Sequence, residues 1–426
     1  MREHWSKLGF ILASIGSAIG LGNIWRFPYI VGENGGGAFL IAYFTAIIIF
    51  GFPLMIMEFA IGEKFKGSVV TSLKKIHPKI KYIGYFAVFV CLGILSYYLV
   101  ITGWTLAYSV FSIFTQIDFT VFTNTLYPIA MFFITLLIIT FIVRTGIKKG
   151  IERVCDVLLP TLFILVILLV VKALTLPNAI EGIRFYLTPN ISSLSNPSMW
   201  LMAIAQALFS LSLGTGILIT YGSYLKKTNI PKSSIIVIIS DTLIAVLAGF
   251  IIFPIVFSFG INPATGPQLA FITLPKIFSF MAFGNFFQTI FFLLLFIGAL
   301  TSAISMMEVG TTTLIDEFRL NRKKATLIVL GIIFIAGLPS ALSYSGFSFT
   351  VFGKTFLDMM DHLFGDILLP VCALVITTGI MWFIKPKELL NEINKNSKIK
   401  IPGFIVPVLK YFIPALLLII VLMELV

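Results

Sequence analysis

Two runs of small and polar residues interrupt long apolar stretches of the sequence, and together they could bind a cation and a carboxylate. The first reads GSAIGLGNIWRFP over residues 16–28, and the second reads SLSLGTG over residues 210–216. Because glycine relaxes the backbone, we expect the helix to unwind within each run. In lipid, unpaired backbone is tolerated only where it is buried in protein or lines a cavity. Freed carbonyls can then bind a cation, and the N-termini of the half-helices can hold a carboxylate.

Glycines in a membrane helix have a simpler explanation, which is close packing against a neighbouring helix. For a single GxxxG pattern we would favour that explanation. Here the interruptions fall in the first and the sixth apolar stretch, and each has hydroxyl or amide side chains beside its glycines. Paired interruptions in corresponding halves of a chain are typical of a transporter's binding site. The pattern therefore favours a binding site.

The composition places the elements that carry these runs in a membrane. Of the 426 residues, 58% are hydrophobic and 11% are charged, whereas soluble domains contain about 25% charged residues. A soluble fold cannot hide this much apolar surface from water. The net charge of +12 would suggest nucleic acid in a soluble protein. Here the basic residues lie between apolar runs, so we expect membrane lipid and no nucleic acid as a partner.

Neither the cysteines nor the N-terminus changes this interpretation. Cys91, Cys155 and Cys372 are scattered within or beside apolar runs, so they predict no disulfide framework and no metal cluster. The N-terminal sequence MREHWSKLGF has no cleavable-signal pattern. We therefore expect the first helix to stay in the mature protein.

A membrane span needs about 20 apolar residues, and the apolar runs predict an all-α polytopic membrane protein with eleven transmembrane helices. The predicted spans cover residues 8–33, 38–63, 82–113, 125–144, 152–174, 198–224, 233–259, 285–318, 325–342, 355–384 and 404–425. We expect one transporter domain over residues 1–426, with helices 1 and 6 unwound. Residues 8–174 and 198–384 would form two repeats of five helices each. Because five is an odd number, the second repeat starts on the opposite side of the membrane and is inverted relative to the first. An additional helix follows at 404–425.

The distribution of basic residues predicts the orientation. Most of the 30 Lys and Arg residues fall in the N-terminal tail and in the loops after the even-numbered spans. Cytoplasmic loops carry an excess of Lys and Arg. We therefore predict a multi-pass protein of the plasma membrane with a cytoplasmic N-terminus and, after eleven spans, an extracellular C-terminus.

Five separated motifs resemble those of one transporter family. They read GSAIGLGNIWRFPYIVGENGGGAFLIAYF over 16–44, KKGIERVCDVLLPTLF over 148–163, FSLSLGTG over 209–216, GALTSAIS over 298–305 and LDMMD over 357–361. In order and spacing they are similar to the neurotransmitter:sodium symporters, in particular the eleven-span, leucine-transporter-like members from bacteria and archaea. The resemblance implies sodium-coupled symport of an amino acid, with two Na⁺ ions and one substrate near the membrane midplane. The family's usual twelfth span is absent, which leaves the oligomeric state open.

The resemblance also implies the ligands of the two ions, and oxygen ligands suit a hard cation. The first ion would be held by the Ala18 carbonyl, Asn23, Ser210, Asp241 and the substrate carboxylate. The second would be held by the carbonyls of Gly16, Ile19 and Gly298 and by the hydroxyls of Thr301 and Ser302. Both hydroxyls could instead cap their own helix backbone, as such side chains usually do.

Asp241 departs from the family's commoner asparagine, and the position one turn later, where some bacterial members carry a glutamate, is Ala245. We expect Asp241 to supply a fixed negative charge, so that transport has no chloride requirement. The alternatives are that Asp241 caps a neighbouring backbone or pairs with a lysine, or that the aligned residue is Ser240. A lone acid at mid-membrane depth is seldom without function.

The resemblance further implies a substrate pocket. Amides around Ser17–Gly22 and the Tyr98 hydroxyl would hold the substrate carboxylate, and nearby carbonyls would hold its ammonium. The predicted substrate-binding residues are Ser17, Ala18, Gly20, Gly22, Ile94, Tyr98, Phe209, Ser210, Ser212, Thr215, Ser302 and Met306. Monoamine carriers have an aspartate where this chain has Gly20, so we expect a substrate with its own carboxylate. Thr215 is small and Met306 is deformable, which favours a large hydrophobic or aromatic L-amino acid.

Alternating access needs a closing layer on each side of the site. By resemblance, Arg26 and Asp361 pair as an outer gate with Asp358 nearby. On the inner side, Arg2 and Asp316 pair, supported by Trp5 and Tyr224. Asp316 could instead be an ordinary helix-end charge beside a basic loop.

The sequence has three alternative interpretations. A carrier of another small carboxylate-bearing solute differs only in substrate. A channel or receptor would show a continuous polar pore or charged rings, whereas the polar residues here form discrete clusters. An enzyme would need a catalytic constellation, but His4, His77 and His362 lie outside the predicted membrane interior. We therefore expect a transporter and not an enzyme.

Overall fold

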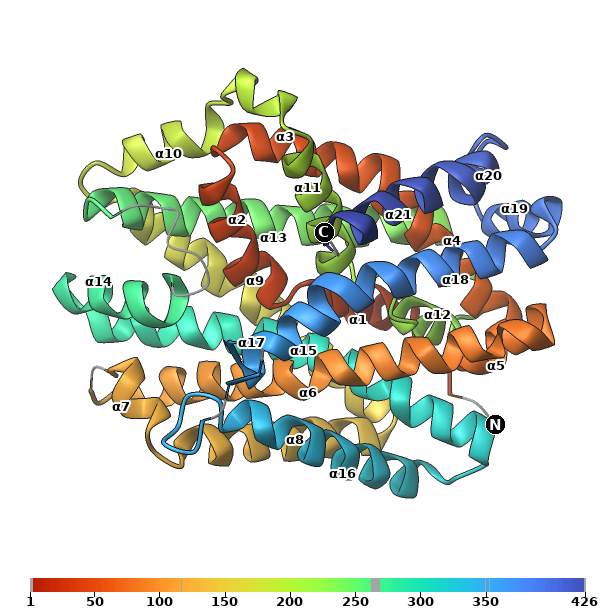
Figure 1. The fold of residues 1–426 in the computed structure, drawn as a ribbon, viewed down its shortest axis with the longest axis horizontal. Helices are drawn as coiled ribbons and strands as arrows, with labels where there is room; N and C mark the ends of the chain where they lie inside the picture. Colours follow the sequence, from red (N-terminus) through yellow and green to blue (C-terminus); the bar gives the residue numbers. More distant parts are fainter. Residues whose placement is uncertain (1–2, 116, 262–268, 349, 352, 425–426) are drawn as a thin grey trace.

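The computed structural model describes residues 3–424 except 116, 262–268, 349 and 352. In that part of the chain, long helices form a bundle, and most of them run along the horizontal axis of Figure 1. The only strands among these residues are β1 (Thr350–Val351) and β2 (Lys354–Thr355), a short antiparallel pair in which Thr350 lies opposite Thr355.

Helices occupy the first five predicted spans, several of them in consecutive pieces. They are α1 (Lys7–Ala18), η1 (Gly22–Arg26) and α2 (Phe27–Glu33); α3 (Gly37–Ala46), η2 (Ile47–Gly51) and α4 (Phe52–Phe65); η3 (Pro78–Ile80) and α6 (Lys81–Phe111); α8 (Tyr127–Thr145); and η4 (Ile147–Glu152) with α9 (Arg153–Leu174).

Helices likewise occupy the later predicted spans. They are α11 (Pro197–Ser210) and α12 (Ile217–Gly222); α13 (Ile230–Ser258); α15 (Gly284–Phe318); α16 (Arg322–Ala341); α17 (Phe356–Met360), η7 (Asp361–Leu368) and α18 (Leu369–Phe383); and α20 (Ile405–Pro407), η8 (Val408–Phe412) and α21 (Ile413–Glu424). Shorter helices lie in the connections: α5 (Val69–Ile76), α7 (Phe119–Thr123), α10 (Ala179–Leu187), η5 (Ile191–Ser195), η6 (Leu269–Thr273), α14 (Leu274–Phe280) and α19 (Pro386–Asn394).

Among the described residues, nine helices are long and apolar enough to cross a membrane. Lys7–Ala18 and Gly22–Glu33 form a tenth span that is bent by 46° at its break. The sixth predicted span consists of α11 and α12, with 14 and 6 residues, and each is too short to cross alone. The all-α polytopic membrane fold is therefore confirmed, whereas the count of eleven and the two inverted repeats stay predictions.

Both predicted breaks are present, and the backbone shows their cause. The first helix ends where Ile19 adopts an extended conformation, with φ −72° and ψ 113°. Between α11 and α12, Ser212, Gly214 and Gly216 have φ values of 54°, 74° and 77°. This left-handed region is natural for glycine and costly for most other residues. The unwinding of helices 1 and 6 is therefore confirmed.

The long helix α15 forms the centre of the bundle and presents its middle to both breaks. In its most apolar stretch, 89% of the residues are buried, and it packs against α1, α6, α9 and α16. A small-residue contact holds α4 against α12, because a Cβ on Gly62 would lie 2.2 Å from the Ile219 carbonyl oxygen. These contacts fix the position of the helix pieces around the breaks.

Candidate substrate and sodium sites

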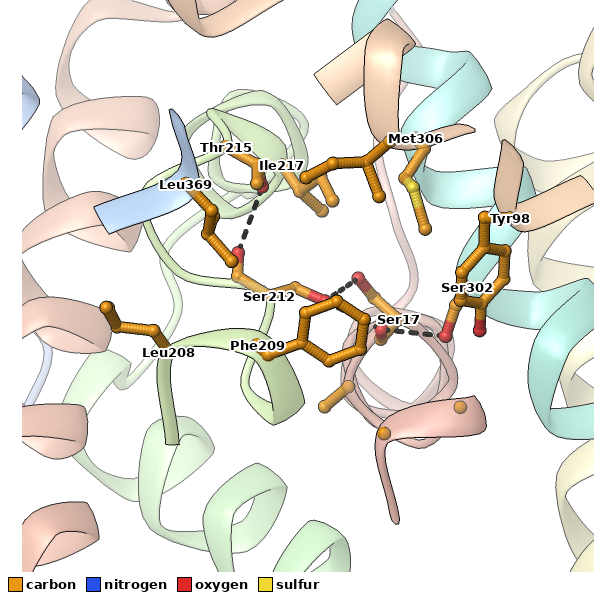
Figure 2. A pocket seen from close by; sticks show the side chains of 14 residues that line it. Ser17, Tyr98, Leu208, Phe209, Ser212, Thr215, Ile217, Ser302, Met306 and Leu369 are labelled. Atoms are coloured by element: carbon orange, nitrogen blue, oxygen red, sulfur yellow. Dashed lines mark hydrogen bonds between the residues drawn. The ribbon is translucent and has the colours of Figure 1, made fainter. Parts of the chain in front are cut away.

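The two breaks and the middles of α6 and α15 enclose one cavity, shown in Figure 2. It is lined by Ser17, Ala18, Gly20, Gly22, Ile94, Tyr98, Leu208, Phe209, Ser212, Thr215, Ile217, Ser302, Met306 and Leu369. All but one of the residues predicted to bind substrate are in this set. The exception is Ser210, whose hydroxyl points to Asp241 instead. The structure thus brings the predicted residues together, and their roles as ligands stay predictions.

One end of the cavity is built from the backbone of the first break. The Leu21 amide donates a hydrogen bond to the Tyr98 hydroxyl at 3.2 Å. Gly20 is packed so closely that a Cβ there would lie 2.6 Å from both the Ser302 hydroxyl and the Tyr98 hydroxyl. Position 20 therefore accepts no side chain, and this end offers amide and hydroxyl donors of the kind that bind a carboxylate.

A chain of hydroxyls crosses the cavity from α1 to the second break (Figure 2). The Ser212 hydroxyl donates to the Ser17 carbonyl at 2.8 Å, and the Thr215 hydroxyl donates to the Ser212 carbonyl at 3.2 Å. On the other side, the Ser17 hydroxyl donates to the Ser305 hydroxyl at 3.0 Å. These bonds tie the unwound segments to each other and to α15.

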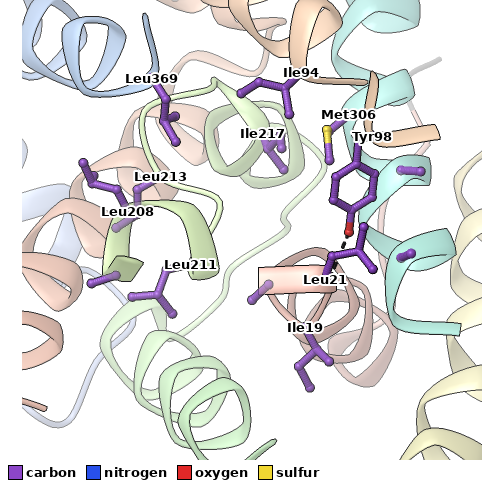
Figure 3. Close-up of a cluster of buried hydrophobic side chains, with 14 of the residues drawn as sticks. Ile19, Leu21, Ile94, Tyr98, Leu208, Leu211, Leu213, Ile217, Met306 and Leu369 are labelled. Carbon is purple, nitrogen blue, oxygen red and sulfur yellow. Dashed lines mark hydrogen bonds between the residues drawn. The ribbon is translucent and has the colours of Figure 1, made fainter. Parts of the chain in front are cut away.

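The remaining wall of the cavity is apolar, as Figure 3 shows. Ile94, Ile217, Met306 and Leu369 contribute aliphatic and thioether groups from four different helices. The Phe209 ring lies between the cavity and Arg26, whose guanidinium carbon is 4.9 Å from the ring centroid. Sequence reasoning missed Leu208, Ile217 and Leu369. Leu208 and Ile217 flank the second break and could have been found there, but Leu369 carries no such signal.

The residues predicted for the first sodium ion form a buried cluster. The Asn23 amide donates to the Asp241 Oδ1 at 2.7 Å, and the Ser210 hydroxyl donates to the two Asp241 carboxylate oxygens at 3.0 and 2.9 Å. All three side chains are buried. Asp241 makes no ion pair with any described lysine or arginine, so its charge is offset by neutral donors alone. An oxygen-rich, electronegative cluster of this kind fits a hard monovalent cation.

The residues predicted for the second ion also meet, at the packing of α1 against α15. The Ser302 hydroxyl donates to the Ser17 and Ile19 carbonyls at 3.0 and 3.1 Å. A Cβ on Gly298 would lie 3.7 Å from the Ile19 carbonyl oxygen, and one on Gly16 would lie 3.1 Å from the Thr301 Cβ. The Thr301 hydroxyl bonds to the Ile297 and Gly298 carbonyls of its own helix, which is the ordinary alternative for such a residue.

The outer ion pair differs from the expected one. Arg26 Nη2 lies 2.9 Å from Asp366 Oδ1, not from Asp361. The reason is local, because η7 is π-helical with hydrogen bonds between residues five apart, which brings Asp361 and Asp366 towards the same face. Asp361 Oδ1 and the Tyr97 hydroxyl each lie 3.1 Å from where a Cβ on Gly365 would be, so Asp361 faces Tyr97.

Asp358 is also placed differently from the prediction. Its carboxylate accepts hydrogen bonds from the Tyr344 and Thr355 hydroxyls at 2.9 and 2.7 Å. These contacts fix the start of α17, and Asp358 makes no ion pair with Arg26 among the described residues. A second cavity lies on the far side of the Arg26–Asp366 pair and shares Leu369 with the first one. The pair and Leu369 therefore separate the two cavities.

The predicted inner gate is described in part, because Arg2 lies outside the described residues. Asp316 Oδ2 accepts a hydrogen bond of 2.6 Å from the Ser68 amide at the start of α5. The Trp5 indole donates to the Tyr221 carbonyl at 3.1 Å and meets the Tyr224 ring edge-on at 6.1 Å. Trp5 thus packs against α12, and its role in supporting an inner gate stays a prediction.

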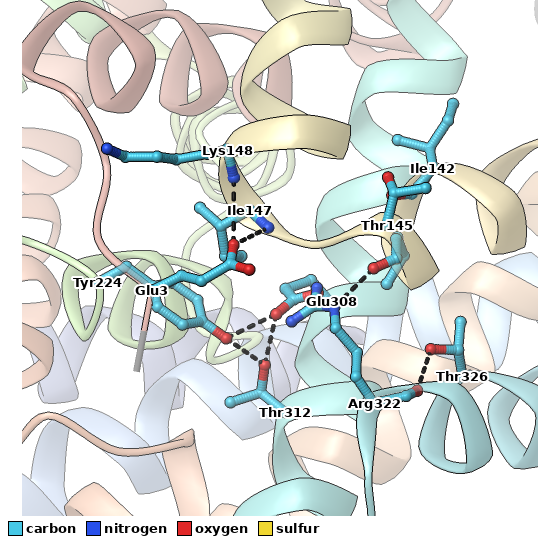
Figure 4. A network of polar contacts seen from close by, with 11 residues as sticks. Glu3, Ile142, Thr145, Ile147, Lys148, Tyr224, Glu308, Thr312, Arg322 and Thr326 are labelled. Carbon is cyan, nitrogen blue, oxygen red and sulfur yellow. Dashed lines mark hydrogen bonds and ion pairs between the residues drawn. The ribbon is translucent and has the colours of Figure 1, made fainter. Parts of the chain in front are cut away.

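A buried polar network that sequence reasoning missed lies next to Tyr224 (Figure 4). Glu308 is fully buried on α15 and forms an ion pair with Arg322. Its carboxylate also accepts from the Tyr224 and Thr312 hydroxyls at 2.6 and 2.7 Å. Nearby, Glu3 accepts from the Ile147 amide at 2.6 Å and so ties the N-terminal segment to η4.

Glu58 on α4 was likewise missed. It is buried, and its Oε1 accepts a hydrogen bond of 2.8 Å from the Gly214 amide in the second break. A glutamate inside an apolar span is a signal that could have been used, because buried acids in membrane helices are rarely without a role. Glu58 satisfies a backbone group that unwinding leaves without a helical partner.

These features define a class of protein: a polytopic membrane transporter with two broken helices around a central site. The family model described as the sodium:neurotransmitter symporter family matches residues 2–130 and 127–426. The chain therefore belongs to the sodium:neurotransmitter symporter family. It is a multi-pass, sodium-dependent symporter and not an enzyme.

Individual relatives agree with this assignment. The chain is 39% identical over 407 residues to an uncharacterized sodium-dependent transporter of Bacillus subtilis, covering 92% of this chain and 90% of the relative. It is 30% identical over 453 residues to the sodium-dependent serotonin transporter of Drosophila melanogaster, covering 92% and 72%. The crystal structure of MhsT in complex with L-phenylalanine matches with a TM-score of 0.90 at 38% identity, over 100% of both chains.

Proposed function

We propose that the protein carries large hydrophobic or aromatic L-amino acids into the cell, coupled to two sodium ions. The observation that carries this proposal is the closeness of Gly20 to the Ser302 and Tyr98 hydroxyls. No acidic side chain fits at position 20, so the carboxylate that faces the first break has to come from the substrate. The likeness to a structure that contains L-phenylalanine supports an aromatic substrate.

In this proposal the substrate spans the cavity from polar to apolar end. Its carboxylate meets the Leu21 amide and the Tyr98 hydroxyl, and carbonyls of Ala18, Phe209 and Ser210 accept from its ammonium. Its side chain packs against Ile94, Met306 and Leu369. The cavity leaves only about 30 Å³ of space for water. A phenyl group therefore fits only if the flexible Met306 side chain and the Phe209 ring move.

The two sodium ions are co-substrates with different partners. The first lies with Asn23, Ser210, Asp241 and the Ala18 carbonyl, where the substrate carboxylate completes its ligands. Binding of substrate and binding of this ion then stabilise each other. The second lies between the carbonyls of Gly16, Ile19 and Gly298 and the hydroxyls of Thr301 and Ser302. Occupancy there holds α1 against α15.

Chloride is not required in this proposal, because Asp241 already supplies a fixed negative charge beside the first ion. Its burial and the absence of a basic partner among the described residues support that role. Chloride-free medium is therefore expected to leave the transport rate within about twofold of its value in chloride. A strict chloride requirement would refute this part of the proposal.

Transport proceeds by alternating access, with the N-terminus in the cytoplasm. Opening on the outside requires separation of Arg26 from Asp366, and opening on the inside requires release of Trp5 from α12. The testing experiment is uptake of a panel of labelled L-amino acids into proteoliposomes, with and without an inward sodium gradient. Gradient-driven uptake of phenylalanine or leucine supports the proposal. Uptake of a non-amino-acid carboxylate alone would favour the alternative carrier.

A further inference from the structure

The connection between α18 and α21 carries an unusual excess of positive charge. Residues 385–410 contain six lysines and two glutamates. Both glutamates are paired, because Glu388 lies 2.9 Å from Lys64 and Glu392 lies 3.4 Å from Lys395. Within the described chain, the other five lysines make no ion pair. We call these five the lysine surface: Lys385, Lys387, Lys398, Lys400 and Lys410.

The lysine surface stands on an ordered platform. The helix α19 buries Leu389 and Ile393 and packs against α4 and α13. After α19, the Asn394 side chain clamps the chain through a 2.8 Å bond from the Ile401 amide and a 3.0 Å bond to the Ile401 carbonyl. Lys398 and Lys400 therefore lie on a folded turn, where the Lys400 ammonium also donates to the Asn394 carbonyl at 2.9 Å.

Apolar side chains accompany these lysines at the surface. Ile399 and Phe404 are 54% and 65% exposed, and Trp382 and Tyr411 are 62% and 60% exposed. The Lys410 ammonium lies 5.3 Å from the Trp382 ring centroid and 5.6 Å from that of Tyr411. Trp and Tyr concentrate where a membrane meets water, so Lys410 lies at the headgroup level between two aromatic rings.

We propose that the lysine surface binds the headgroups of anionic phospholipids. Clusters of four to eight basic residues next to a membrane helix attract anionic lipid. The exposed Ile399 and Phe404 can enter the acyl boundary beside them. The rule that cytoplasmic loops are basic explains the charge of this segment. It does not explain why five lysines that make no ion pair among the described residues share this segment with exposed aromatic side chains.

The position of the surface fits this role. Figure 1 shows α19 and α20 at the right-hand end of the bundle, the end at which the N-terminus and α5 also lie. In the orientation proposed above this end faces the cytoplasmic leaflet, where anionic lipids attract basic segments. The ion pair between Lys64 and Glu388 joins α19, and with it the lysine surface, to α4.

In the test, purified full-length protein is mixed with equal amounts of phosphatidylglycerol and phosphatidylcholine. Native mass spectrometry then measures how much of each lipid the protein retains. The wild type is expected to retain phosphatidylglycerol at least tenfold more than phosphatidylcholine. In the variant Lys385→Gln/Lys387→Gln/Lys398→Gln/Lys400→Gln this preference is expected to fall at least tenfold. A wild type without preference would overturn the proposal.

A matched control removes the same charge from the same predicted side of the membrane. The control variant Lys148→Gln/Lys149→Gln/Lys323→Gln/Lys324→Gln changes lysines on η4 and α16, which pack against helices other than α19. It is expected to keep the preference within about twofold. An equal loss in both variants would show a general charge effect and refute a site. If the first variant fails to fold, a photoreactive phosphatidylglycerol is used on the wild type. Its adducts are expected within residues 382–412, and adducts only elsewhere would refute the proposal.

Discussion

Arg26 and Asp366 face each other across the outer end of the central site, with 2.9 Å between Nη2 and Oδ1. Both side chains are part-buried, and His362 approaches the other Asp366 oxygen at 3.3 Å. The pair lies between the central cavity and an outer one. In the proposed mechanism, separation of this pair is the step that admits substrate from outside.

Replacing Asp366 by asparagine is expected to slow sodium-driven uptake about tenfold, equivalent to ~1.4 kcal/mol. The reason is that Arg26 loses its charged partner in the state that is closed to the outside. The matched change Asp361→Asn keeps the Arg26–Asp366 pair and is expected to slow uptake less than threefold. Initial rates in proteoliposomes measure both. A larger loss for Asp361→Asn than for Asp366→Asn would show that the closing pair is the one first expected from sequence.

Neutralising Asp241 is expected to change the ion requirements of transport. Asparagine keeps the hydrogen-bonding shape beside Asn23 and Ser210 but removes the fixed charge. We expect the sodium concentration for half-maximal uptake to rise about tenfold, and we expect chloride to stimulate the variant but not the wild type. Uptake is measured in chloride and in gluconate media. A variant that behaves as the wild type in both media would disprove the assigned role of Asp241.

A methyl group at position 20 is expected to abolish substrate binding. In Gly20→Ala the Cβ would lie 2.6 Å from the Ser302 and Tyr98 hydroxyls, so these groups and the break must shift. We expect at least a hundredfold weaker binding of the transported amino acid, measured by scintillation proximity. Gly331→Ala is the control, because a Cβ there meets nothing within 4 Å. Normal binding by Gly20→Ala would contradict the proposed carboxylate position.

Removing Arg322 is expected to destabilise the protein, because Glu308 is then left charged and buried without its partner. Breaking a buried pair by removing one member typically costs about 3–5 kcal/mol. Arg322→Gln should therefore lower the thermal midpoint in detergent markedly, and Arg322→Gln/Glu308→Gln should recover most of it. The midpoint is followed by size-exclusion after heating. A double variant no more stable than the single one would argue against the pair as the cause.

Much of the site could be predicted because its residues are unusual where they occur. Gly16, Gly20 and Gly22 with Asn23 stand out in an apolar span. The structure places Gly20 in the first break, Gly16 in the last turn of α1, and Gly22 and Asn23 at the start of η1. Asp241 stands out as a lone acid, and it contacts Asn23 and Ser210. Small and polar residues are rare in lipid unless they are needed there.

Other parts could not be read from the sequence, for physical reasons. Arg26 pairs with Asp366 and not with Asp361 because η7 is π-helical, and no residue pattern in the sequence predicts a π-helix there. Leu369 reaches the cavity from a distant span and is one leucine among many. Glu308 and Arg322 meet because the chain turns between α15 and α16, so their pairing depends on tertiary structure.

A sodium gradient is proposed to drive uptake of an aromatic or large hydrophobic L-amino acid. The most direct measurement is uptake of labelled L-phenylalanine into proteoliposomes, with sodium outside and potassium inside, and with potassium on both sides as the control. We expect accumulation above the outside concentration only with the sodium gradient, and we expect it to be lost when an ionophore collapses that gradient. Equal uptake with and without sodium would contradict sodium-coupled symport.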